Sequence, residues 1–178
     1  MDPEFLLIKK MKKGDEESFE IFIRKYYGDI LAYCGHHCGD RQYAEDIAQE
    51  TFLRFFAGLS RYSHRGKSKN YLYTVAGNLC RDFYRKKREF PQDDLPKKGE
   101  GLTGPGEADP EKDRLMSLKE AVDRLPPELK DAVILRYFQD LKIKDTAKAL
   151  GITTSLAKYR LEKAKKQLKD FMEKEDAL

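Results

Sequence analysis

The residues with the clearest chemical potential are six basic side chains between Leu156 and Lys169. They are Lys158, Arg160, Lys163, Lys165, Lys166 and Lys169, and Glu162 is the only acidic residue among them. Lysine and arginine donate hydrogen bonds to phosphate oxygens, and they also reach guanine edges in the major groove of DNA. The segment therefore indicates nucleic-acid binding, although a solvated, lysine-rich helix face has the same composition.

Helical periodicity separates these basic residues from an apolar stripe that would pack against other helices. The stripe consists of Ala157, Leu161, Ala164 and Leu168, which recur at intervals of three or four residues. Upstream, two consecutive prolines open one helix, and a second short helix ends at Gly151. Three helices in this order are typical of a helix-turn-helix, whose last helix enters the major groove of DNA.

The rest of the chain also has helical patterning, and a polar segment divides it. Apolar residues before residue 88 recur at helical spacing, and no stretch shows the strict alternation of a half-buried strand. Residues 89–113 hold four of the seven prolines, four of the twelve glycines, and eight acidic against three basic residues. This composition is typical of a flexible linker. We therefore expect an all-α protein with domains in residues 1–88 and 113–178, joined by a linker in residues 89–112.

Composition narrows the classes of function. The 178 residues carry a formal net charge of +4 and contain no apolar run of membrane-spanning length, so we expect no membrane insertion. Three cysteines without a secretory signal favour the reducing cytoplasm. The absence of a glycine-rich phosphate loop and of a convincing nucleophile–base pair argues against a nucleic-acid-processing enzyme and against a cofactor.

One short segment holds four potential metal ligands in five residues: Cys34, His36, His37 and Cys38. Ligands on one helical face would suit zinc binding or redox sensing. Four ligands this close rarely surround one tetrahedral ion, and Gly35 and Gly39 would weaken a helix here. We therefore predict no metal site and interpret the cysteines as buried thiols.

Two N-terminal motifs and the C-terminal helices together resemble one protein family. AEDIAQETFLRFF (residues 44–56) is similar to the most characteristic stretch of bacterial RNA polymerase sigma factors, and NYLYTVAGNLCRDFYRKKR (residues 70–88) to the helix that follows it. With the helix-turn-helix downstream, residues 15–169 resemble the extracytoplasmic-function (ECF) group of the sigma-70 family. The resemblance implies region 2-like and region 4-like domains in a factor that directs promoter-specific transcription initiation by core RNA polymerase.

The resemblance also assigns roles to residues of the N-terminal motifs. In the family the first motif binds the clamp helices of the beta-prime subunit, and the matching residues here are Asp46, Gln49, Glu50 and Arg54. The second motif and the loop before it open the minus-ten element and capture a flipped base. The family usually has tryptophan where this chain has Tyr71. The matching residues are Tyr62, His64, Arg65, Lys67, Lys69, Asn70, Tyr71, Tyr73, Asn78, Arg81, Arg85 and Lys86.

By the same resemblance, the last helix reads the minus-thirty-five element, and the beta flap of the polymerase is a further partner. The matching residues are Ser155, Lys158, Tyr159, Arg160, Glu162, Lys163 and Lys165. Ser155 is also the predicted N-cap of that helix. Family members are commonly held inactive by an anti-sigma factor, and the sequence leaves open whether this chain has one. The alternative function is a helix-turn-helix regulator that binds duplex DNA without the polymerase.

Overall fold

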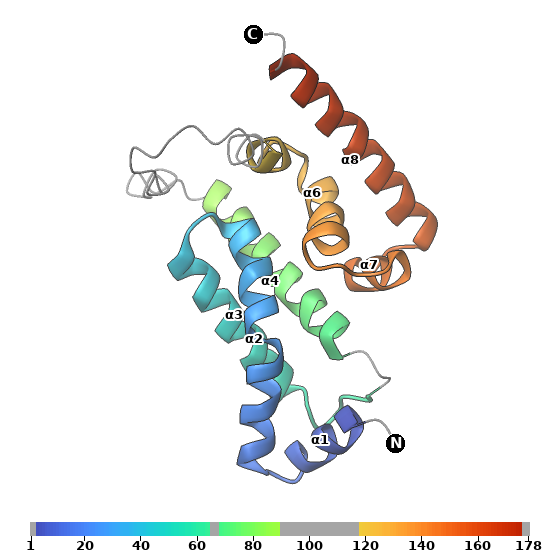
Figure 1. Cartoon of the computed structure of the whole chain (residues 1–178). Helices are drawn as coiled ribbons and strands as arrows, with labels where there is room; N and C mark the ends of the chain where they lie inside the picture. Colours follow the sequence, from blue (N-terminus) through green and yellow to red (C-terminus); the bar gives the residue numbers. More distant parts are fainter. Residues whose placement is uncertain (1–2, 65–67, 90–117, 176–178) are drawn as a thin grey trace, which may run out of the picture. The chain divides into compact units, whose positions relative to one another are not determined.

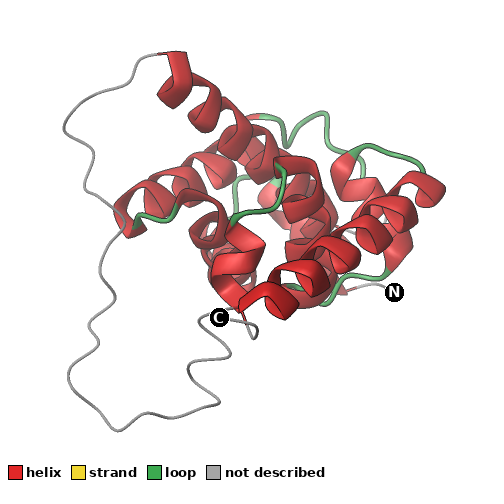
Figure 2. Cartoon of the chain, turned by 90° about the horizontal axis from the view of Figure 1, so that it is seen from above, coloured by secondary structure: helices red, strands yellow, loops and turns green. Residues whose placement is uncertain are grey.

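The computed structural model describes residues 3–64, 68–89 and 118–175, and every regular element in these ranges is a helix (Figures 1 and 2). The expected all-α class is therefore confirmed for this part of the chain. None of the described helices combines the length and apolar character that a membrane span requires. The chain divides into two compact units, Met1–Gly99 and Glu100–Leu178, and the division falls inside the predicted linker.

Four helices build the first unit: α1 (Pro3–Met11), α2 (Glu16–Cys38), α3 (Arg41–Ala57) and α4 (Ser68–Glu89). Side-chain caps set where two of them begin. The carboxylates of Asp15 and Asp40 accept hydrogen bonds from the backbone amides of Ser18 and Tyr43, each at 3.1 Å. Gly39 ends α2 in the left-handed backbone region, with a φ of 67°, which glycine adopts without steric cost. These caps place the sharp turn between α2 and α3.

Aromatic rings hold α2, α3 and α4 together. Phe22 of α2 stacks on Phe55 of α3 with ring centres 4.8 Å apart, and both side chains are fully buried. About three turns further along α2, Tyr33 meets Tyr73 of α4 edge-on, with ring centres 5.3 Å apart. Gly77 permits this close approach, because a Cβ atom there would lie 2.9 Å from the Tyr33 hydroxyl oxygen. The core of the first unit thus fixes α3 and α4 on a common support.

The second unit contains a helical segment at residues 118–123, α6 (Pro127–Val133), a π-helical turn η1 (Ile134–Phe138), α7 (Ile143–Leu150) and α8 (Thr154–Glu175). In the π turn, the Gln139 amide donates to the Ile134 carbonyl oxygen at 3.0 Å, five residues back. α7 ends at Gly151, whose φ is 65°, as the sequence predicts. The order of helices expected for a helix-turn-helix is therefore present.

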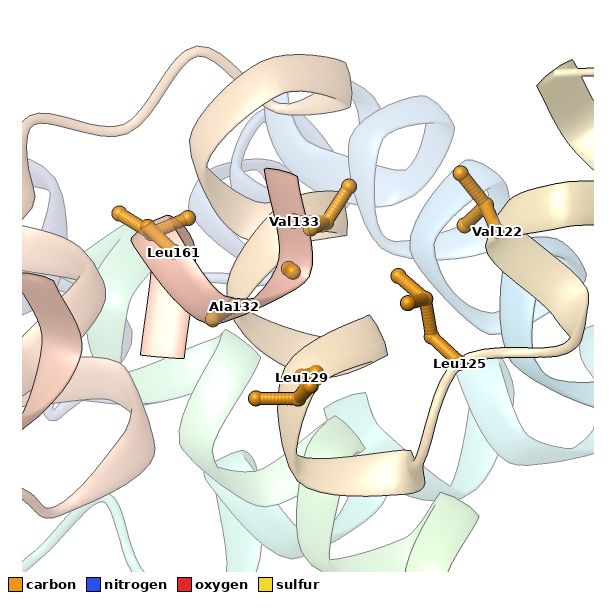
Figure 3. Close-up of a cluster of buried hydrophobic side chains, with 7 residues drawn as sticks. Val122, Leu125, Leu129, Ala132, Val133 and Leu161 are labelled. Carbon is orange, nitrogen blue, oxygen red and sulfur yellow. The ribbon is translucent and has the colours of Figure 1, made fainter. Parts of the chain in front are cut away.

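The apolar stripe of α8 closes the core of the second unit. Ala157 is fully buried, and Leu168 packs against the central cluster, as the periodicity predicts. Figure 3 shows that this cluster joins α8 to the helices before it. Its members are Val122, Leu125, Leu129, Ala132, Val133, Leu161 and Ala164. Because this stripe faces inward, the basic residues of α8 are left on the outer side.

The N-cap of α8 differs from the one expected. The Thr153 hydroxyl oxygen accepts a hydrogen bond from the Leu156 amide at 3.2 Å, so Thr153 fills this role. Ser155 lies inside the helix, and its assignment as the cap was wrong. The helix begins earlier than predicted because a threonine, which caps almost as well as a serine, precedes it.

Candidate nucleic-acid and polymerase interfaces

The outer face of α8 carries the residues predicted to read the minus-thirty-five element. Tyr159 is 60% exposed, and the Lys163 ammonium nitrogen lies 5.9 Å from the centre of its ring. Arg160 is half-buried at the edge of the face. The other exposed members are Ser155, Lys158, Glu162 and Lys165. A single helix therefore presents cationic, hydroxyl and carboxylate groups together, as a reader of base edges and phosphates requires.

Tyr137 of η1 lies beside this face, and sequence reasoning missed it. Lys165 pairs with Glu162 at 3.2 Å and also hydrogen-bonds to the Tyr137 hydroxyl, and both contacts raise the pKa of Lys165. The guanidinium carbon of Arg136 lies 5.7 Å from the centre of the Tyr137 ring. The adjacent arginine and tyrosine were an available signal, but spacing alone does not place them next to α8.

The exposed face of α3 carries the residues predicted to bind polymerase. Asp46, Gln49 and Arg54 are exposed, while the half-buried Glu50 carboxylate lies 2.7 Å from the Arg54 guanidinium. Leu53 shares this face by helical spacing and is 63% exposed. Sequence reasoning missed Leu53, although it falls out of phase with the buried positions of α3. An apolar side chain surrounded by charged and amide groups is a common composition for a protein-binding surface.

The loop between α3 and α4 places several aromatic rings next to one another. Ser68 Oγ lies 3.1 Å from the Tyr62 hydroxyl and 3.2 Å from His64 Nδ1, so the first residue of α4 ties both side chains to the helix. Burial raises the pKa of Tyr62. The centre of the Tyr71 ring lies 5.4 Å from that of Tyr62 and 5.9 Å from that of Phe55, yet Tyr71 is 43% exposed. We name Tyr62 and Tyr71, backed by Phe55, the aromatic shelf; its open side suits stacking of a nucleic-acid base.

The structure separates the other minus-ten candidates into buried and exposed groups. Tyr73 is 1% exposed and Asn70 is 9% exposed, and burial raises the pKa of Tyr73. Both belong to the core of the first unit, which corrects the expectation that they contact DNA. Lys69 forms an ion pair with Asp29 at 2.7 Å. The exposed candidates on α4 are Tyr71, Asn78, Arg81, Arg85 and Lys86, while Arg65 and Lys67 lie outside the described residues.

The cysteine- and histidine-rich segment lies at the end of α2. Cys34, His37 and Cys38 are buried, and α2 runs through Gly35, although that glycine was expected to weaken a helix. Packing of α2 against α3 and α4 outweighs the low helix propensity of one glycine. Among the residues that the structure describes, no group of three or more His, Cys, Asp or Glu side chains is placed to hold a metal ion.

Comparisons with known sequences follow the same division of the chain. Residues 22–90 match the family described as Sigma-70 region 2, and residues 115–168 match the one described as Sigma-70, region 4. The ECF RNA polymerase sigma factor SigW of Bacillus subtilis (strain 168) is 29% identical over 179 residues. That similarity covers 92% of this chain and 96% of SigW.

Two solved structures share the fold. CnrH, determined in complex with the cytosolic domain of CnrY, is similar with a TM-score of 0.73 at 16% identity, over 97% of this chain and 98% of its own. The sigma factor RpoE, determined with the anti-sigma factor NepR from Bartonella quintana, has a TM-score of 0.70 at 20% identity. This second similarity covers 88% of this chain and 98% of RpoE.

Proposed function

The chain belongs to the sigma-70 family of RNA polymerase sigma factors, in its ECF group, and from this premise we propose how its residues work. The protein binds core RNA polymerase and directs promoter-specific transcription initiation. The observation that carries the proposal is that each of the two units contains the match to a different sigma region. A helix-turn-helix regulator that acts without the polymerase would need only the second unit.

We assign polymerase binding to the exposed face of α3. Asp46 and Glu50 offer carboxylates, and Gln49 an amide, to basic and polar groups on the beta-prime clamp helices. Leu53, about one turn beyond Gln49 and Glu50 on the same face, adds an exposed apolar contact. Arg54 holds the Glu50 carboxylate in the free protein through their ion pair.

We assign recognition of the minus-ten element to the aromatic shelf and to α4. Extruding a base costs a few kcal/mol, which stacking on Tyr71 and Tyr62 and contacts to the DNA backbone must offset. Arg81, Arg85 and Lys86 lie exposed on α4 and supply cationic groups for the phosphates. Packed aromatic rings next to exposed cations suit single-stranded DNA better than duplex DNA.

We assign the minus-thirty-five element to the outer face of α8. The exposed Lys158, Tyr159 and Lys163 would contact base edges, and Lys165, which hydrogen-bonds to Tyr137, would contact a phosphate. The beta flap would bind the same unit. The protein would act in the cytoplasm and catalyse no reaction of its own. An anti-sigma factor is a further proposed partner, since the similar RpoE structure contains one.

The affinity of core RNA polymerase for α3 variants tests the proposal. Asp46→Ala should weaken binding to the core enzyme by about tenfold or more, as truncation of a central interface residue does. Glu45→Ala is the matched control, because it removes the same charge from the next residue, about 100° around the helix. Glu45 forms an exposed ion pair with Arg41 at 2.9 Å, so this change should leave the affinity within about twofold.

The outcomes separate the two functions. Equal affinities for the two variants would refute the assignment of polymerase binding to α3 but would leave the sigma-factor function standing. A wild-type protein that does not bind the core enzyme, but does bind specific duplex DNA, would favour the regulator.

A further inference from the structure

Helix α1 is packed against the loop that carries part of the aromatic shelf. Figure 1 shows α1 beside this loop, at the end of α4 where that helix begins. The Lys12 ammonium group donates to the Tyr62 carbonyl oxygen at 2.6 Å and lies 3.4 Å from the Ser60 carbonyl oxygen. The rings of Phe5 and His64 are 6.4 Å apart. Two separate contacts therefore fix one side of α1 next to the proposed DNA-binding loop.

Helical spacing determines which other residues share this side of α1. Lys9 follows Phe5 by four residues and precedes Lys12 by three, so it lies between the two residues that contact the loop. The buried residues Ile8 and Met11 mark the adjoining, inward side. Phe5, Lys9 and Lys12 thus form one exposed strip, which we name the α1 strip.

The positive charge of the α1 strip is not neutralised within the described residues. The Lys12 ammonium group contacts carbonyl oxygens, which carry no net charge, and Lys9 is exposed and forms no ion pair with a described carboxylate. Lys10, about 100° further around the helix, is different because the Asp15 carboxylate interacts electrostatically with it. The uncompensated cations therefore gather on the side of α1 that faces the loop.

We propose that the α1 strip extends the single-stranded DNA path beyond the aromatic shelf, with Lys9 binding a backbone phosphate of the strand that leaves the shelf. The inference rests on the proposed minus-ten role of the shelf. The cations Arg81, Arg85 and Lys86 lie along the later turns of α4, whereas α1 lies at its beginning, so the shelf has cationic groups on both sides. A path of alternating cations and aromatic rings is what binding to a single strand requires.

Fork DNAs bound to the holoenzyme test this proposal. Two probes share one duplex and minus-ten element, and the exposed strand of the longer probe continues roughly ten nucleotides further, within the reach of one such surface. The wild-type holoenzyme should bind the longer probe more tightly. Lys9→Glu should reduce this gain in affinity by about tenfold. It should also lower the slope of log affinity against log salt concentration by about 0.7 per lost phosphate contact. Lys10→Glu has the same net charge and should keep the gain.

Each outcome has a separate meaning. The proposal fails if Lys9→Glu keeps the full gain, if both charge reversals lower it equally, or if Lys9→Glu instead weakens binding to the core enzyme. The last result would make the α1 strip a protein contact. If the wild-type holoenzyme does not recognise even the shorter probe, the minus-ten assignment itself is wrong.

Discussion

Replacing Tyr71 by alanine tests the aromatic shelf most sharply. The exposed part of the ring is available to a base. The rest packs against Tyr62 and Phe55, whose ring centres lie 5.4 and 5.9 Å from the centre of the Tyr71 ring. Base–aromatic stacking contributes about 1–3 kcal/mol per base, so Tyr71→Ala should weaken fork-DNA binding by roughly five- to 150-fold. Losing two ring contacts should also lower the free energy of unfolding by about 1–3 kcal/mol.

The assay measures fork-DNA affinity of the holoenzyme, with a fluorescent base analogue reporting when the base leaves the stack. Tyr71→Phe retains the ring and should keep most of the affinity, and Tyr71→Trp, the residue usual in the family, should bind at least as well. Thermal unfolding and core binding are measured on each variant, so that misfolding is separated from lost stacking. The reasoning is refuted if Tyr71→Ala binds like the wild type, or if Tyr71→Phe loses as much as Tyr71→Ala.

Three further predictions concern the scaffold beneath these interfaces. Gly77→Ala should lower the free energy of unfolding by about 1–3 kcal/mol, because its Cβ would lie 2.9 Å from the buried Tyr33 hydroxyl. At Gly35 a Cβ atom would meet open space, so Gly35→Ala should raise the free energy of unfolding by up to about 1 kcal/mol. Equal changes for the two glycine variants in urea unfolding would contradict this account. Thr153→Ala should lower the free energy of unfolding by about 1 kcal/mol, and Ser155→Ala by less than about 0.5 kcal/mol. The reverse order in thermal unfolding would restore Ser155 as the cap. Burial acts to raise the pKa of Glu4, but hydrogen bonds from Lys25, Ser68 and Tyr26 outweigh it and lower that pKa below 4.5. The stability that Glu4 contributes is therefore present above its unfolded-state pKa and is lost as the pH falls through the lower folded-state pKa. When the free energy of unfolding is measured against pH, Glu4→Gln should remove this loss of stability at low pH. An unchanged pH profile would count against the hydrogen bonds to Glu4.

Local patterns predicted the second unit well. Ala157, Leu161 and Ala164 are buried and Leu168 is partly buried, because α8 presents one face to the core and the periodicity of that face is visible in the sequence. Gly151 ends α7 for an equally local reason, since glycine adopts the left-handed backbone conformation without strain. The exposed basic face of α8 follows from these two facts alone.

Features that depend on tertiary packing were not predictable in this way. Tyr73 and Tyr71 are close in sequence and both aromatic, yet only the packing of α4 against α2 decides that Tyr73 is buried and Tyr71 is half exposed. The contact of Lys12 with Tyr62 joins residues far apart in sequence, and no local pattern records it. Tyr137 lies beside Lys165 for the same kind of reason, because η1 and α8 meet only in the folded unit.

Run-off transcription with sigma-free core RNA polymerase, on a pool of promoters from the source genome, tests the central claim most directly. We predict specific transcripts that appear only when the protein is added and disappear when Asp46 and Gln49 are both replaced by alanine. The start sites would also define the minus-ten and minus-thirty-five sequences. A core enzyme that gives the same transcripts with and without the protein would contradict the account.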